Sequence, residues 1–109
     1  MRLRILSVLA AALALTAFAL PSDSNQGQIL VQNQSSHTIY YIYASPCSSS
    51  DWGNDLLGSD VLPSGRSFYI DVVAGCWDLR AEAQNGTVTE ARGAQVGAGQ
   101  QVPWTLFDQ

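Results

Sequence analysis

The sequence predicts an all-β protein, a small antiparallel β-sandwich or open barrel of about six strands. Two observations support this fold class: apolar residues recur at every second position in short runs, and turn-forming residues separate the runs. In addition, no amphipathic pattern is long enough for a stable helix. The expected strands cover residues 28–33, 38–45, 67–73, 76–84, 87–91 and 101–107.

The first two strands differ in character. Residues 28–33 carry Ile29 and Val31 on one face, and the polar residues 34–37 form a turn. Residues 38–45 are apolar on both faces, with Tyr41 among three tyrosines. A strand that is apolar on both faces is usually covered on both sides, so we expect this one to be central in its sheet.

A long polar segment, residues 48–62, follows Cys47. Ser50 or Asp51 could cap a helical turn over residues 52–57, because both side chains accept hydrogen bonds from free backbone N–H groups. The glycines in this segment limit such a helix to a turn or two. We therefore expect a compact loop with a short helical turn between Cys47 and Leu62.

The second half of the chain alternates more regularly. Residues 67–73 place Phe68, Ile70 and Val72 on one face, and residues 76–84 alternate apolar and charged side chains. On the polar face of the latter strand we expect Asp78 and Arg80 to form a solvated pair. Asn85–Gly86 is a strong hairpin signal that joins this strand to residues 87–91. Pro103 cannot donate a ladder hydrogen bond, which predicts an edge position for the last strand.

The N-terminal residues have the organisation of a secretory signal peptide. Arg2 and Arg4 precede an apolar run over residues 5–17, and Ala17-Phe18-Ala19 forms a small-residue cleavage site. The run is shorter than the ~20 residues of a membrane-spanning helix. We expect residues 1–19 to be cleaved, residues 20–27 to be a flexible lead-in, and residues 28–109 to be one domain. The mature protein is then exported, periplasmic or extracellular, with no membrane span.

Charge and cysteine content narrow the functional classes. The chain has a formal net charge of −4, and loss of Arg2 and Arg4 makes it −6. Such an acidic domain repels phosphate backbones, so we expect no nucleic-acid partner, and we expect a monomer. Cys47 and Cys76 are the two cysteines, and in an oxidising compartment an even pair usually forms a disulfide. Two free thiols or a thiol metal site are the alternatives.

Several segments carry a family resemblance. They are Trp-Gly-x-Asp-Leu-Leu from Trp52, Leu-Pro-x-Gly from Leu62, and Cys-x-x-Asp-Leu-Arg from Cys76. The chain from about Ile29 to Val96 resembles a group of small exported bacterial proteins of unknown function with a β-rich fold. In that group the corresponding cysteine is paired with one nearer the C-terminus. Here residues 93–97 contain no cysteine, and Cys47 takes that place.

Catalytic signals are weak. His37 is the single histidine, it lies in a turn, and no Gly-x-Ser-x-Gly elbow presents a nucleophile. Asp51, Asp55 and Asp60 could hold a hard cation such as calcium, although their spacing does not match an EF-hand. Asp and Asn also favour loops for backbone reasons alone. We therefore expect no cofactor, with calcium as the alternative.

Trp52 is the strongest binding candidate. A large aromatic residue in a polar, glycine-flanked loop either plugs the end of a sandwich or anchors a partner. Asp55 and Tyr41 are the residues that we expect to share its surface. The leading hypothesis is an exported, non-enzymatic binding or interaction module for a protein or envelope ligand. A calcium-stabilised structural module and a small secreted hydrolase are the alternatives.

Overall fold

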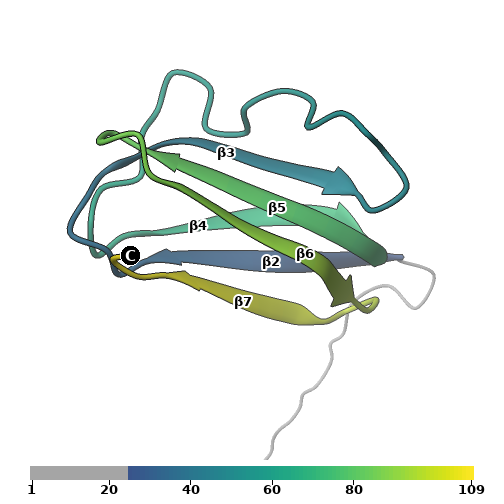
Figure 1. Ribbon diagram of the computed structural model, residues 1–109. Coiled ribbons are helices and arrows are strands. Elements are labelled where there is room, and N and C mark those ends of the chain that lie inside the picture. Colours follow the sequence, from purple (N-terminus) through teal and green to yellow (C-terminus); the bar gives the residue numbers. More distant parts are fainter. Residues whose placement is uncertain (1–24) are drawn as a thin grey trace, which may run out of the picture.

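The computed structural model describes residues 25–109, which form an all-β fold (Figure 1). The six strands are β2 (Gln26–Asn33), β3 (Ile39–Pro46), β4 (Ser67–Val73), β5 (Gly75–Ala83), β6 (Val88–Val96) and β7 (Gln101–Leu106). The expected signal peptide and residues 20–24 lie outside the described residues. No helix occurs between residues 25 and 109, so the short helical turn expected between Cys47 and Leu62 is wrong.

The strands form two three-stranded sheets, in the orders β4-β2-β7 and β3-β5-β6. All neighbouring strands are antiparallel except β2 and β7, which are parallel. The edge position expected for the Pro103 strand, β7, is confirmed. The central position expected for residues 38–45 is wrong, because β3 is an edge strand.

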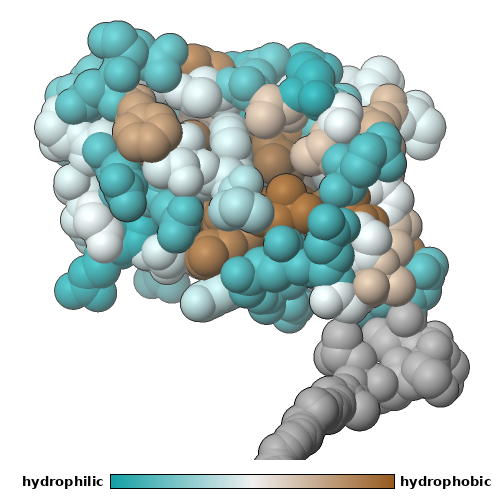
Figure 2. Space-filling view, turned by 90° about the horizontal axis from the view of Figure 1, so that it is seen from below, coloured by the Kyte–Doolittle hydropathy of each residue, from teal (hydrophilic) through white to brown (hydrophobic). Residues whose placement is uncertain are grey.

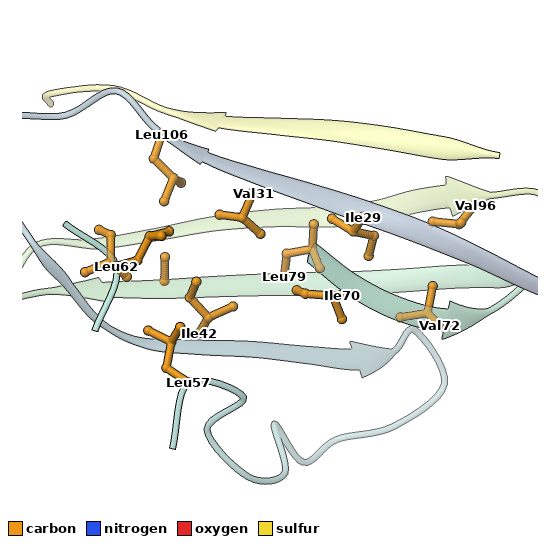
Figure 3. Close-up of a cluster of buried hydrophobic side chains, with 12 residues drawn as sticks. Ile29, Val31, Ile42, Leu57, Leu62, Ile70, Val72, Leu79, Val96 and Leu106 are labelled. Carbon is orange, nitrogen blue, oxygen red and sulfur yellow. The ribbon is translucent and has the colours of Figure 1, made fainter. Parts of the chain in front are cut away.

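The core lies between the two sheets (Figure 3). Ile29, Val31 and Ile42 are fully buried, and Leu79 is 1% exposed. The expected faces of β2 and β4 are confirmed as the inward ones, because Ile70 and Val72 belong to the same cluster as Ile29 and Val31, and Leu106 of β7 joins them. Seen from below Figure 1, where β7 is the lowest strand, a band of apolar atoms is visible between polar rims (Figure 2). Apolar atoms are therefore exposed at the surface on this side.

A β-bulge explains why β3 misled the sequence interpretation. The pairing with β5 shifts between Ile39 and Tyr41, so that Tyr40 is an extra residue on β3. An extra residue breaks the alternation of faces. Ile39 and Ile42 therefore point into the core, while Tyr40 and Tyr41 between them are both exposed. The apolar residues that suggested burial on two sides include two tyrosines on the outer surface.

The disulfide between Cys47 and Cys76 is confirmed, with the two Cα atoms 5.4 Å apart. It joins the end of β3 to the start of β5, next to a backbone hydrogen bond from Cys47 N to the Cys76 carbonyl of 3.1 Å. The bridge thus fixes the point where the chain leaves the sheet and the Cys47–Leu62 loop begins.

The Cys47–Leu62 loop lies along the outer edge of β3 and occupies its free backbone groups. Leu56 N donates to the Ile42 carbonyl at 2.7 Å, and Asp55 Oδ1 accepts from Ile42 N at 2.9 Å. At the far end, Ile39 and Leu62 exchange two hydrogen bonds of 2.9 Å. An edge strand covered in this way cannot pair with another chain. These hydrogen bonds hold the segment extended along β3, which accounts for the absence of the helical turn.

No helix among residues 25–109 has the length and hydropathy needed to cross a bilayer.

The hairpin predicted at Asn85–Gly86 is confirmed. This turn joins β5 to β6, and Ala83 N donates a hydrogen bond to the Thr87 carbonyl at 2.8 Å.

Candidate binding surface

Four aromatic side chains form a connected row on the outer face of the β3-β5-β6 sheet. The ring centroids are 6.4 Å apart for Tyr40 and Tyr41, 6.5 Å for Tyr41 and Tyr43, and 6.4 Å for Tyr43 and Trp52. Tyr40 and Tyr41 are 38% and 44% exposed. We call these four residues the aromatic row. The β3 bulge supplies its first two members, and the Cys47–Leu62 loop supplies Trp52.

Trp52 lies on two arginine side chains and does not belong to the hydrophobic core cluster. The guanidinium carbon of Arg92 is 4.9 Å from the Trp52 ring centroid, and that of Arg80 is 5.9 Å away. Guanidinium groups at such distances are attracted to the negative face of an indole ring. The loop tryptophan is thus held over the sheet by Arg80, Arg92 and Tyr43, and its side chain remains half-buried.

The arginines beneath Trp52 belong to a chain of ion pairs across β5 and β6. Arg80 pairs with Glu82 at 2.9 Å and with Glu90 at 2.5 Å. Arg92 pairs with Glu90 at 2.9 Å and with Asp78 at 3.5 Å. Both guanidinium groups are fixed by these contacts. The surface below the tryptophan is therefore preorganised.

These contacts shift the pKa values of the charged groups. Hydrogen bonds from Arg92 and then Arg80 lower the pKa of Glu90 below its usual value of 4.5. Hydrogen bonds to Glu82 and Glu90 raise the pKa of Arg80, and the hydrogen bond to Glu90 raises that of Arg92. Desolvation, followed by the negative charges of Glu82 and Asp55, raises the pKa of Tyr43. Tyr43 consequently remains a neutral hydrogen-bonding phenol throughout the neutral range.

Asp78 is buried, which corrects the expectation of a solvated Asp78–Arg80 pair. Its Oδ1 accepts a hydrogen bond from Gly93 N at 2.9 Å, and its Oδ2 faces Arg92. The β5–β6 register shifts at this point, and β6 has one extra residue opposite Asp78. Arg80 pairs instead with Glu82 and Glu90. The bulge turns Arg92 toward Trp52, a placement that strict alternation could not predict.

A shallow groove of about 420 Å³ adjoins the exposed end of the aromatic row. Tyr40 and Tyr41 line one side, and residues 58–61 of the Cys47–Leu62 loop line the other. Val61, at the rim, is 46% exposed, and Asp60 adds a carboxylate. The groove is larger than the cavity of about 90 Å³ that Trp52 lines at the other end of the row.

The loop acids have separate positions and roles. Asp55 Oδ1 accepts hydrogen bonds from Ile42 N at 2.9 Å and from Leu57 N at 3.1 Å, so it serves as a backbone cap. Asp51 lies beside Trp52 in a small cavity of about 90 Å³, and Asp60 lies at the groove. Among residues 25–109, no group of three or more His, Cys, Asp or Glu side chains is gathered in a way that could hold a metal ion.

His37 lies near Asp108 but is not oriented by it. Asp108 Oδ1 accepts hydrogen bonds from Ser36 N at 2.8 Å and from Ser36 Oγ at 3.0 Å. These bonds, and then the nearby His37, lower the pKa of Asp108 below its usual 3.8. A hydrolytic triad needs an acid that orients the histidine and a serine that the histidine can deprotonate. The hydrogen bonds of the described residues do not form such an arrangement.

The structure therefore brings together two of the three predicted binding residues. Trp52 and Tyr41 lie in one row, while Asp55 contacts backbone groups below it. The sequence interpretation missed Tyr43, Arg80 and Arg92. The alternation of residues 76–84 did place Arg80 on the outer face, and a search for cations that could contact the loop tryptophan would have found it.

Comparison of the chain with protein-family models, with curated proteins and with solved structures gives no match.

Proposed function

We propose that this protein is an exported, non-enzymatic binding module that holds a protein partner on the outer face of the β3-β5-β6 sheet. The observation that carries the proposal is the aromatic row, which is connected by ring contacts and ends in a tryptophan supported by two arginines. Tryptophan, tyrosine and arginine are the residues most enriched at binding hot spots.

The composition of this surface supports a protein partner. The Cys47–Leu62 loop is rich in serine, aspartate and glycine, contains one asparagine, and presents one tryptophan next to three tyrosines. Antibody paratopes combine the same residue types, because rigid aromatic rings supply contact area at low entropic cost while small polar residues adapt their hydrogen bonds. The disulfide supports export, since such bonds persist in oxidising compartments.

Preorganisation also favours recognition. The ion pairs of Arg80 and Arg92 fix the groups beneath Trp52, and backbone hydrogen bonds fix the loop at Ile42 and Ile39. A surface that is already ordered loses less conformational entropy on binding. The groove between Tyr41 and residues 58–61 would take a partner side chain.

Site-specific photocrosslinking tests the proposal. A photoreactive phenylalanine analogue replaces Tyr41 in the exported protein, and cells are irradiated before extraction. We expect a discrete crosslinked product that disappears when Trp52→Ala is added. The matched control places the analogue at Phe107, which is 61% exposed, follows β7 of the other sheet and lines neither of the two hollows beside the aromatic row. Equal products at both positions, or none at Tyr41, would contradict the proposal.

A further inference from the structure

We infer that β4 is a dimerisation edge, through which two copies of this chain pair antiparallel into one continuous sheet. The inference concerns the sheet opposite the aromatic row, so it does not depend on the proposed binding function. It rests on the backbone groups that β4 leaves unpaired and on how the other strand edges are blocked.

The alternation of hydrogen bonds along β4 shows which of its backbone N–H and C=O groups are unpaired. Asn33 N donates to the Arg66 carbonyl at 2.9 Å, and Ala74 N donates to the Asn25 carbonyl at 2.7 Å, at the two ends of the β2–β4 pairing. In an antiparallel pair, alternate residues exchange hydrogen bonds. The even-numbered residues of β4 therefore face β2. The N–H and C=O groups of Ser67, Tyr69 and Asp71 point away, and within residues 25–109 they meet no hydrogen-bond partner.

The free edges of β3 and β7 do not present an unbroken run of unpaired backbone groups. The Cys47–Leu62 loop occupies the free edge of β3, as described above. On β7, the bonds from Gln28 N to the Gln100 carbonyl and from Gln34 N to the Leu106 carbonyl show that even-numbered residues face β2. Pro103 is thus turned outward, where its missing N–H interrupts the edge.

The β6 edge is interrupted by its bulge at Arg92 and Gly93, where the Gly93 N–H is already bound by Asp78. Bulges and prolines are the devices by which edge strands avoid pairing. β4 has no proline, and its pairing with β2 is regular from Ser67 to Val73. It is the edge strand without such protection in the described part of the chain.

The free stretch of β4 is self-complementary. The Val73 carbonyl accepts a hydrogen bond from Trp77 Nε1 at 2.8 Å, so the available groups are those of Ser67, Tyr69 and Asp71, centred on Tyr69. A two-fold axis at Tyr69 places it opposite Tyr69 of the partner subunit, and it places Ser67 opposite Asp71 of the partner subunit. No two acidic side chains then face each other, and the aromatic pair adds cross-strand contact.

The two-fold pairing would extend the sheet order to β7-β2-β4-β4-β2-β7. Edge pairing buries little side-chain area, and each copy carries a net charge of −6 without its expected signal peptide. Stable dimers normally bury larger interfaces. We therefore expect association that depends on concentration and strengthens with salt, which screens the repulsion between the copies.

Sedimentation equilibrium of the exported protein, with Ser67 variants, tests the register. Ser67→Lys places a cation opposite Asp71 of the partner subunit at both ends of the pair, and Ser67→Asp places like charges there. We expect the first to lower the dimer dissociation constant, and the second to raise it, by roughly tenfold each. Ser67 is exposed, so neither change should impair folding. A protein that remains monomeric at millimolar concentration, or variants that associate identically at equal ionic strength, would overturn the inference.

A cysteine trap tests the two-fold axis. In a hydrogen-bonded antiparallel pair, opposite Cα atoms are ~5.5 Å apart, which lies within the range of disulfides. Tyr69→Cys should therefore form a covalent dimer on mild oxidation. Gln101→Cys, also exposed but on the β7 edge, is the matched control and should remain monomeric. Equal crosslinking of the two variants would contradict pairing through β4.

Discussion

The carboxylate of Asp78 and the backbone of Gly93 are joined by a hydrogen bond of 2.9 Å between Oδ1 and N. Gly93 has a φ of +72°, in the left-handed region that other residues adopt at a cost. This hydrogen bond holds the β6 bulge of Arg92 and Gly93, which directs Arg92 toward Trp52. A buried acid that the sequence placed on a solvated face thus fixes the geometry of the candidate binding surface.

Removing the Asp78 carboxylate should destabilise the bulge. Asp78→Ala leaves the Gly93 N–H without its acceptor, and we expect a loss of about 1–3 kcal/mol in the free energy of unfolding. Asp78→Asn keeps an acceptor at Oδ1 and should cost less. Urea denaturation of both variants measures the difference. Equal stability of the Ala variant and the native protein would show that the bulge does not depend on Asp78.

Gly93→Ala tests the backbone contribution separately. An added Cβ at Gly93 would meet no atom within 4 Å, so the only penalty is the positive φ. We expect a loss of about 1–2 kcal/mol in the free energy of unfolding. The matched comparison is Gly27→Ala, where the Cβ would clash with Val96 and with the Gly97 carbonyl oxygen. A Gly93 variant less stable than the Gly27 variant would contradict this ranking.

Asp55→Ala should release the Cys47–Leu62 loop from β3. The change removes the acceptor of both Ile42 N and Leu57 N, and we expect a loss of about 1–2 kcal/mol in stability. Hydrogen exchange of the Ile42 amide should accelerate more than that of the β5 amides. Asp60→Ala is the control, and its stability should change by less than about 0.5 kcal/mol. If both variants instead lose affinity in a calcium titration, the calcium-stabilised alternative is supported.

Asn33→Asp should be strongly destabilising. The 1% exposed side chain of Asn33 donates from Nδ2 to the His37 carbonyl at 2.9 Å and to the Leu62 carbonyl at 3.0 Å. A carboxylate would place charge against both carbonyl oxygens, which we expect to cost about 3 kcal/mol or more. Asn85→Asp, on the exposed turn, keeps its acceptor for Thr87 N and serves as the control. Similar melting temperatures for the two variants would argue against this account.

Acid should weaken the ion pairs below Trp52. Because the folded-state pKa of Glu90 is lowered from 4.5, its stabilising contribution is present above that pH and is lost as pH falls below it. Glu90→Gln should therefore flatten the dependence of stability on pH below about 4.5 and should lower stability at pH 7. Thermal unfolding between pH 3 and 7 measures both effects. Parallel pH curves for the native protein and the variant would contradict the assignment.

The sequence predicted strand faces and turns better than it predicted the position of each strand in its sheet and the burial of individual polar residues. The inward faces of β2 and β4, the edge position of β7 and the Asn85–Gly86 turn follow from periodicity, proline chemistry and turn chemistry, which are local. The two errors of greatest effect, the position of β3 and the exposure of Asp78, both arise at bulges. A bulge changes the face of every residue beyond it, and it depends on the partner strand rather than on local propensity.

The candidate site was predictable to a similar extent. Trp52 stands out as a large aromatic in a polar loop, and both Trp52 and Tyr41, which was expected to share its surface, lie on the outer face. The arginines that support Trp52 come from β5 and β6, more than 25 residues away along the chain. The edge-covering role of Asp55 depends on a hydrogen bond to Ile42, which a pattern of loop acids cannot reveal.

The Cys47–Leu62 loop is hydrogen-bonded to β3 mainly through its main-chain atoms, at Ser49, Asp51, Leu56 and Leu62. The side chain of Asp55 adds hydrogen bonds, Trp52 contacts Tyr43, and Leu57 and Leu62 are buried in the core. Main-chain hydrogen bonds do not depend on which side chains the loop carries. Residues 59–61, which form most of one wall of the groove, can therefore change identity while the loop stays in place, whereas Gly58 has a φ of +62° that favours glycine. The fold separates the part of the chain that secures the loop from the part that a partner would meet, so its binding preference could diversify, in evolution or by library selection, without loss of stability.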